Sequence, residues 1–116
     1  MSLAKKLNLQ AGMTMRIVGG PADVDLADVV GTTSLEAEAL LVFVKTRAEV
    51  DATCAPLIEA ARRDRLAWVA YPKAGQLGTD LNRDRLREHL LAHGIDSVRQ
   101  VAIDDVWSAL RFRPAK

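Results

Sequence analysis

The sequence has little cysteine and few aromatic residues. Its 116 residues include one cysteine, two tryptophans, one tyrosine and two phenylalanines. A single cysteine, Cys54, cannot form an internal disulfide bond, so nothing in the sequence points to an oxidising compartment. The scarcity of aromatic side chains also argues against a module that binds single-stranded nucleic acid by stacking bases.

Net charge and long apolar runs are lacking as well. Sixteen basic and fifteen acidic side chains give a net charge of +1, which produces no bulk attraction to nucleic acid or to an anionic membrane. No apolar run reaches the roughly 18 residues that a membrane span requires. The N-terminal segment has neither the long apolar core nor the cleavage site of a signal peptide. We therefore expect a cytoplasmic protein that has no membrane partner and binds no nucleic acid.

Apolar residues are abundant, and their pattern predicts strands. They make up 49% of the sequence and charged residues 27%, as in ordinary globular domains. Two nearly continuous apolar runs of strand length, at 39–44 and 66–71, are typical of strands covered on both faces. Shorter or alternating patterns predict further strands at 13–18, 97–103 and 107–113, and a brief one at Thr32–Leu35.

Capping residues and apolar stripes predict the helices. Thr46 followed by Glu49 forms a capping box, and the apolar stripe after it predicts a helix over 47–62 with a kink at Pro56. Asn82 is the predicted N-cap of a helix over 83–93, and the glycine after that helix favours a left-handed cap. Two short helices are also predicted, at Ala4–Leu9 and Ala22–Val30.

The order of these elements predicts the fold. Strands that alternate with helices pair in parallel through right-handed crossovers. The last strand follows too short a turn for a crossover and must run antiparallel. The predicted fold class is α/β: residues 1–116 form one truncated, three-layer, Rossmann-like domain whose mixed sheet is mostly parallel and ends in an antiparallel hairpin.

This fold would gather polar residues at one edge of the sheet. Ligands of open parallel sheets bind at the carboxyl ends of the strands. We call this edge the strand-end rim, and its predicted ligand-binding residues are Tyr71, Lys73, Asp80, Asp104, Trp107 and Ser108.

Each of these residues also has a purely structural interpretation. Lys73 is equally expected of a solvated loop, and Tyr71 of the last position in a strand. Asp80 suits a helix cap, in competition with Asn82. Asp104 and its neighbour suit a tight turn, and the tryptophan after them suits a packed core.

Metal, nucleophile and cofactor signals are weak. His89 and His93 lie four residues apart on one predicted helix, but no cysteine or carboxylate stands at motif spacing to complete a zinc site. Cys54 lies on an apolar stripe and is interpreted as a core residue. The outward-facing arginines Arg111 and Arg113 are expected to be solvated. We predict no metal, no cofactor and no identifiable catalytic residue.

Two stretches resemble a small bacterial family of unknown function. They are WVAYPKAGQLGTDLNRD (68–84) and VAIDDVWSALRFR (101–113). In that family a strand ending in YPK, a TDL-RD helix start and a D-x-WS-LRF hairpin recur. The wider layout is similar to the C-terminal half of Rossmann-type methyltransferases, whose sheet also ends in an antiparallel hairpin. That likeness implies a glycine-rich cofactor turn, but the segment GGPADVD (19–25) contains Pro21 and no acidic-ended second strand follows it. We therefore expect neither S-adenosylmethionine nor a dinucleotide to bind.

Two functional hypotheses follow. The first is a non-catalytic binding or regulatory domain that recognises a partner protein through the strand-end rim or an edge of the sheet. The second is an enzyme or small-anion-binding protein centred on Tyr71, Lys73, Asp104 and Trp107. A deep pocket at the strand ends would favour the second hypothesis, and a shallow surface would favour the first.

Overall fold

A computed structural model of the chain describes residues 2–34 and 37–116. Its elements follow one another in the order α1 (Leu3–Lys6), β1 (Met15–Val18), β2 (Gly31–Thr32), β3 (Ala39–Phe43), α2 (Arg47–Thr53), α3 (Ala55–Arg62), β4 (Leu66–Pro72), α4 (Arg83–Leu91), β5 (Ile95–Ala102) and β6 (Trp107–Pro114). The five longer strands begin and end within two residues of their predicted bounds. Of the brief strand expected at Thr32–Leu35, β2 contains Thr32, whereas Leu35 lies outside the described residues.

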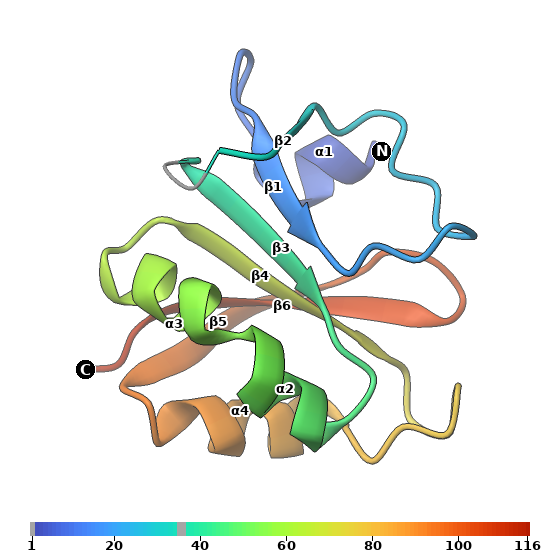
Figure 1. Ribbon diagram of the computed structural model, residues 1–116, viewed down its shortest axis with the longest axis vertical. Helices are drawn as coiled ribbons and strands as arrows, with labels where there is room; N and C mark the ends of the chain where they lie inside the picture. Colours follow the sequence, from blue (N-terminus) through green and yellow to red (C-terminus); the bar gives the residue numbers. More distant parts are fainter. Residues whose placement is uncertain (1, 35–36) are drawn as a thin grey trace.

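The strands of the described chain form one sheet of six, in the order β2-β1-β3-β4-β6-β5 (Figure 1). β2, β1, β3 and β4 pair in parallel, whereas β6 is antiparallel to both of its neighbours, β4 and β5. The chain is therefore an α/β protein with a mostly parallel mixed sheet and an antiparallel end pair, as the order of elements predicted. β6 lies between β4 and β5, a position that the sequence left open.

The two central strands carry the core. Every residue of β3 and β4 is buried, because each strand has covered faces on both sides, and this explains their continuous apolar runs. Successive side chains of a strand point to opposite faces. Thus Leu40 and Val42 pack in the cluster with the long helices, whereas Leu41 and Phe43 pack in the cluster on the other face.

Helices α2, α3 and α4 cover the first face (Figure 1). The Thr46 hydroxyl accepts a hydrogen bond from the Glu49 amide at 3.2 Å, as the predicted capping box requires, whereas the Glu49 carboxylate accepts its bond from the Lys45 amide at 3.1 Å, one residue before the N-cap. The single helix predicted over 47–62 is two helices that meet at Cys54. The break follows from Pro56, whose ring nitrogen cannot donate to the preceding helical turn.

The second face has a different cover. It consists of α1 and the irregular segment 19–30, whose Val24 and Val29 are buried against the sheet. The helix predicted over Ala22–Val30 is wrong, because the segment is a series of turns. The Asp25 carboxylate accepts a hydrogen bond from the Ala27 amide at 3.0 Å, a local bond that competes with helix formation.

The first helix is also shorter than the predicted Ala4–Leu9. It ends at Lys6, and Asn8 adopts a positive φ of 62°. The reason is tertiary: Leu7 is fully buried, and its carbonyl accepts a hydrogen bond from Trp68 Nε1 at 3.0 Å. None of the helices in the described ranges is long and apolar enough to cross a membrane.

At the C-terminal end, the predicted caps of α4 are present. The Asn82 side chain accepts a hydrogen bond from the Arg85 amide at 2.8 Å, and Gly94 has a φ of +85°. On β6, Arg113 is exposed and paired with Asp64, but Arg111 is only partly exposed and its Nε is buried without a partner among the described residues. The expectation that Arg111 is mostly solvated is therefore wrong.

Candidate functional site

The parallel direction of the strands brings the predicted rim segments together. The loop after β4 lies against the hairpin turn, because the Lys73 amide donates to the Val106 carbonyl at 2.7 Å and Pro72 pairs with Trp107. The same loop continues to the start of α2, where Thr79 Oγ1 donates a hydrogen bond to the carbonyl of Lys45, the residue before the N-cap of that helix. The strand-end rim is therefore a continuous structural edge.

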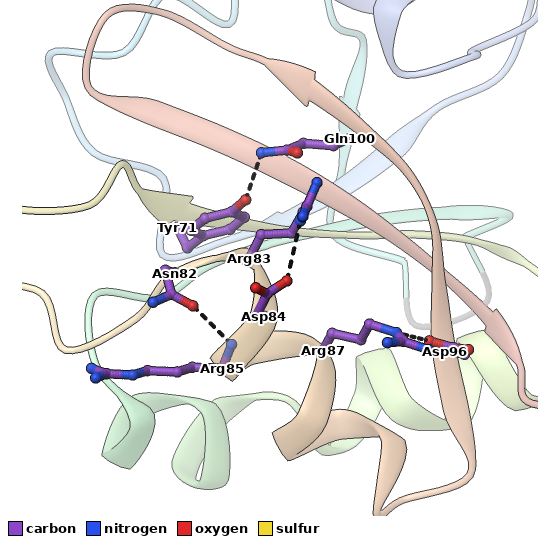
Figure 2. A network of polar contacts seen from close by, with 8 residues as sticks. All are labelled: Tyr71, Asn82, Arg83, Asp84, Arg85, Arg87, Asp96 and Gln100. Atoms are coloured by element: carbon purple, nitrogen blue, oxygen red, sulfur yellow. Dashed lines mark hydrogen bonds and ion pairs between the residues drawn. The ribbon is translucent and has the colours of Figure 1, made fainter.

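Tyr71 and Ser108 are joined on the helix-covered face of the sheet. They are directly opposite each other in the β4–β6 ladder, and both are buried. The Tyr71 hydroxyl accepts a hydrogen bond from Gln100 Nε2 at 2.9 Å (Figure 2) and is also hydrogen-bonded to Ser108. Burial raises the pKa of Tyr71, against smaller opposing effects of Arg83 and of these hydrogen bonds. The phenol is therefore held neutral and directed toward β5.

Trp107 lies on the opposite face. It is buried, and its ring packs edge-on against Phe43 with centroids 5.1 Å apart and an interplanar angle of 76°. Adjacent residues of a strand point to opposite faces, so Trp107 and Ser108 cannot line one pocket. The sheet separates Trp107 from Tyr71.

The two predicted rim carboxylates bind backbone amides. Asp104 Oδ1 accepts hydrogen bonds from the amides of Val106 and Trp107, at 2.8 and 2.7 Å, and so stabilises the hairpin turn. Asp80 Oδ1 accepts from the amide of Arg47, the first residue of α2, at 2.9 Å. Asp80 thus caps a helix, but α2 rather than the following α4.

Lys73 is half-buried, and within the described part of the chain its ammonium makes no hydrogen bond or ion pair. This ammonium therefore makes no ion pair with the Asp104 carboxylate. The structure brings the backbones of the rim residues together, but it divides their side chains between two faces and a turn.

Local steric requirements explain Gly19 and Gly20, the two glycines that follow β1. Gly19 has a φ of +73°, and a Cβ there would lie 3.2 Å from the Phe43 carbonyl oxygen. A Cβ on Gly20 would lie 3.1 Å from the Ile17 side chain. Both glycines allow the chain to turn tightly over the end of β3.

A polar hollow lies between α4 and the terminal hairpin. It encloses about 290 Å³ and is lined by Arg83, Asp84, Arg87, Ser97, Arg99, Gln100 and Leu110. We call it the arginine hollow. Figure 2 shows its ion pairs: Arg87 contacts Asp96 at 2.7 and 3.3 Å, and Arg83 contacts Asp84 at 3.4 Å.

Sequence reasoning did not select Arg99 or Gln100 as site residues. Both lie on β5, which the sequence identified as a strand without showing that it is the edge of the sheet. The Arg99 side chain has no hydrogen-bond or ion-pair partner among the described residues. The one available signal was the pair of polar residues in the middle of the apolar pattern DSVRQVAI.

Another group of polar side chains joins α2 to the C-terminal end of α4. His89 Nε2 lies 2.7 Å from Asp51 Oδ1. α4 ends at Leu91, so His93 lies in the turn after it, with its ring 6.3 Å from the ring of His89. The sequence paired the two histidines but gave no sign that Asp51, 38 residues earlier, completes the group.

The sequence matches no protein-family model, and no curated protein matches it significantly.

Proposed function

We propose that this chain is a non-catalytic binding domain of Rossmann-like architecture that binds a partner protein along the exposed edge of its sheet. The strand order supports the architecture, because β2 and β3 lie on opposite sides of β1 and the sheet ends in an antiparallel pair. Both features are expected of a trimmed Rossmann-type methyltransferase sheet.

The binding element of this proposal is β5, which is eight residues long and lies at the end of the strand order. The Ile103 amide donates to the Trp107 carbonyl at 2.9 Å. The backbone N–H and C=O groups of successive residues point alternately toward and away from the neighbouring strand of an antiparallel ladder. Those of Arg99 and Val101 therefore point toward β6, whereas those of Gln100 and Ala102 point away from it. An edge of this kind can accept an extended segment of another chain as an additional strand.

One end of this edge is already covered. Lys6 Nζ donates to the Ala102 carbonyl at 3.1 Å, so a lysine blocks the end nearest the hairpin turn. The accessible part is centred on Val98 and Gln100, and Val98 is 55% exposed at a register shift between Ser97 and Arg99. The proposed contact is therefore short, and we expect an affinity suited to a reversible interaction.

The charges beside this edge specify the partner. Arg99 has an exposed guanidinium without a partner in the described chain. Arg83 and Arg87 lie beside the same strand in the arginine hollow, where each also contacts an acidic side chain, Asp84 and Asp96 respectively. We propose an extended peptide segment with acidic side chains, whose backbone pairs with β5 and whose carboxylates meet these arginines. The observation that carries the proposal is the unpaired outer side of β5 next to Arg99.

The state of the strand-end rim supports a non-catalytic function. Tyr71 is buried and neutral, and the Asp80 and Asp104 carboxylates bind backbone amides. Two hollows lie away from the rim, one beside α2 and α3 on the helix face and one beside the N-terminal end of β3. Catalysis at the rim would require these groups to leave bonds that stabilise the fold.

A displayed library of random extended peptides, selected against the protein, tests this proposal. We expect enrichment of alternating sequences with acidic residues, and perturbation of the Gln100 amide signal in NMR titrations. Gln100→Pro removes one outward amide, and Arg99→Glu reverses the charge. Each should weaken binding at least tenfold. Arg63→Glu on α3 is the matched control and should leave binding unchanged. Enriched peptides without acidic residues, or signals that move at the rim instead, would contradict the proposal.

Small-anion binding is the second candidate function. It is favoured by the arginine hollow and by Lys73 at the rim, which is half-buried and has no side-chain partner among the described residues. In this alternative Lys73 binds the anion at the rim, next to the backbones of Tyr71, Asp104 and Trp107. A thermal-shift series with inorganic phosphate, nucleotides and S-adenosylmethionine tests it. Stabilisation lost in Lys73→Ala would place the anion at the rim, whereas stabilisation lost in Arg83→Ala would place it in the hollow.

A further inference from the structure

A set of metal-ligating side chains lies between α2 and the C-terminal end of α4. Asp51, His89 and His93 each offer one ligand atom, and the three atoms lie within 4.8 Å of one another. Two of them already share a close contact, because His89 Nε2 is 2.7 Å from Asp51 Oδ1. Coordination of a metal ion by both atoms would replace this hydrogen bond.

The backbone holds these residues in place. His89 is on α4 and Asp51 is on α2, and α2 is fixed at its start by the Thr46 cap. The His93 carbonyl accepts two hydrogen bonds from the Arg62 guanidinium, at 2.9 and 2.6 Å, which tie the turn after α4 to α3. The three ligands therefore come from anchored positions.

The donor set selects a class of ion. Two imidazole nitrogens and one carboxylate oxygen suit divalent zinc and its neighbours in the first transition row, whereas Mg²⁺ and Ca²⁺ prefer sets made of oxygen alone. We propose that Asp51, His89 and His93 form a binding site for such an ion, with Zn²⁺ as the representative. The proposal does not depend on the binding of a partner along β5.

The geometry requires small movements. Zinc ligands at about 2.1 Å in tetrahedral geometry lie roughly 3.4 Å from one another. The His89–Asp51 contact must therefore widen by about 0.7 Å, and no other separation has to shorten by more than about 1.4 Å. The Asp51 side chain is 64% exposed and His93 is exposed, so rotation of these two side chains supplies both movements. His89, whose side chain is 17% exposed, is the fixed member.

The surroundings leave the ion accessible. Asp51 and His93 line a hollow of about 580 Å³, whose wall also includes Glu59 and Arg63. Those two side chains form an ion pair at 2.7 Å. Arg62 also lines the hollow, and its guanidinium donates to the His93 carbonyl. Three protein ligands leave a coordination position for water or for a donor from another molecule. The ion would link the helices of two successive crossovers and present an open position to the hollow.

Calorimetric titration of the tag-free protein with Zn²⁺ at neutral pH tests the proposal. We expect one ion per chain, and an affinity for Zn²⁺ much greater than for Mg²⁺. His89→Gln, His93→Gln and Asp51→Asn should each reduce the affinity at least tenfold. Glu88→Gln, which removes an exposed carboxylate beside His89 without touching the cluster, is the matched control and should bind like the wild type.

The Asp51→Asn variant decides between this site and a simpler one. Two histidines four apart on a helix can chelate a metal by themselves, so undiminished binding by Asp51→Asn would overturn the three-ligand site. Failure of the wild-type protein to bind Zn²⁺ would overturn it as well. Titration of the unmodified protein with paramagnetic Ni²⁺ provides a check that needs no variant: amide signals of Asp51 and of 89–93 should broaden first, and broadening elsewhere would count against the site.

Discussion

The Asp80 carboxylate accepts a hydrogen bond from the amide of Arg47 at 2.9 Å, although the two residues are 33 positions apart. The loop after β4 thereby supplies the N-terminus of α2 with an acceptor in addition to Thr46. An Asp80→Ala substitution should lower the free energy of unfolding by about 1 kcal/mol, as the loss of a helix cap does. Urea denaturation measures this loss. Asp84→Ala, on the exposed face of α4, should cost clearly less, and equal losses would show that Asp80 is no cap.

The two aspartates of the hairpin turn should differ in their effect on stability. Asp104 accepts hydrogen bonds from two amides, whereas Asp105 has no side-chain hydrogen bond or ion pair among the described residues. Asp104→Ala should therefore lower the free energy of unfolding by about 1–2 kcal/mol, and Asp105→Ala by less than about 0.5 kcal/mol. Thermal denaturation of both variants makes the comparison. A larger loss for Asp105→Ala than for Asp104→Ala would contradict the role of Asp104 in stabilising the turn.

Trp68 should be the more sensitive of the two tryptophans. Its indole donates to the Leu7 carbonyl inside the core, so Trp68→Phe removes a hydrogen bond and leaves a cavity. The expected loss is at least about 2 kcal/mol in the free energy of unfolding. Trp107→Phe keeps the aromatic contact with Phe43 and serves as the control, with an expected loss near 1 kcal/mol. Urea titrations followed by circular dichroism report both values, and similar losses would contradict the role of the Leu7 bond.

Acid should weaken the fold through two ion pairs. The hydrogen bond from Arg113 lowers the pKa of Asp64, and the hydrogen bond from Arg87 lowers the pKa of Asp96. A carboxyl whose pKa is lower in the folded state stabilises the fold above its unfolded pKa, about 3.9. This contribution is then lost as the pH falls below 3.9 toward the folded value. Both pairs are solvent-exposed, so the effect should be small and should shrink in 1 M salt.

Melting temperatures measured from pH 7 to pH 3 test this expectation. Arg113→Gln should flatten the part of the decline that belongs to Asp64. Arg63→Gln, which removes a different exposed arginine, should keep the wild-type slope. Melting temperatures that rise on acidification would be inconsistent with both pairs.

Cys54 should be chemically inert in the folded protein. Burial raises the pKa of its thiol to about 11, so almost no thiolate is present at neutral pH. We expect iodoacetamide to label the native protein far more slowly than the urea-unfolded chain, by a factor of at least 100. Rapid labelling of the folded protein would show that the junction of α2 and α3 opens readily.

The sequence predicted the parts of the fold that depend on local patterns. The continuous apolar runs at β3 and β4 predict strands that are buried on both faces. The Thr46 and Asn82 caps are also predictable, because each involves a backbone amide only three residues further along the chain. The helix predicted over 22–30 is wrong because the valines of this segment reach the sheet from turns. The spacing of apolar residues alone does not distinguish such turns from a helix. The prediction of a single helix over 47–62 is also wrong. Pro56 was expected to kink this helix, but it divides it into α2 and α3.

The candidate site was less predictable, because its geometry depends on residues distant in sequence. Parallel strand ends placed Tyr71 and Trp107 on one rim, but the pleat that turns them to opposite faces depends on register. The partner of Asp80 and the neighbour of His89 both lie on α2, more than 30 residues earlier. Neither contact has a signal in the spacing of residues along the chain.

The position of β6 affects how the protein can be made. This strand is the last element in the order of the chain, yet it lies inside the sheet between β4 and β5. A ribosome synthesises the chain from its N-terminal end. The edge of β4 that pairs with β6 therefore stays unpaired until residues 107–114 have emerged. During this interval one edge of a strand that is fully buried in the folded protein remains unpaired. Completion of the sheet must therefore follow translation of β6, and a messenger that stops before that strand would yield a product prone to aggregation.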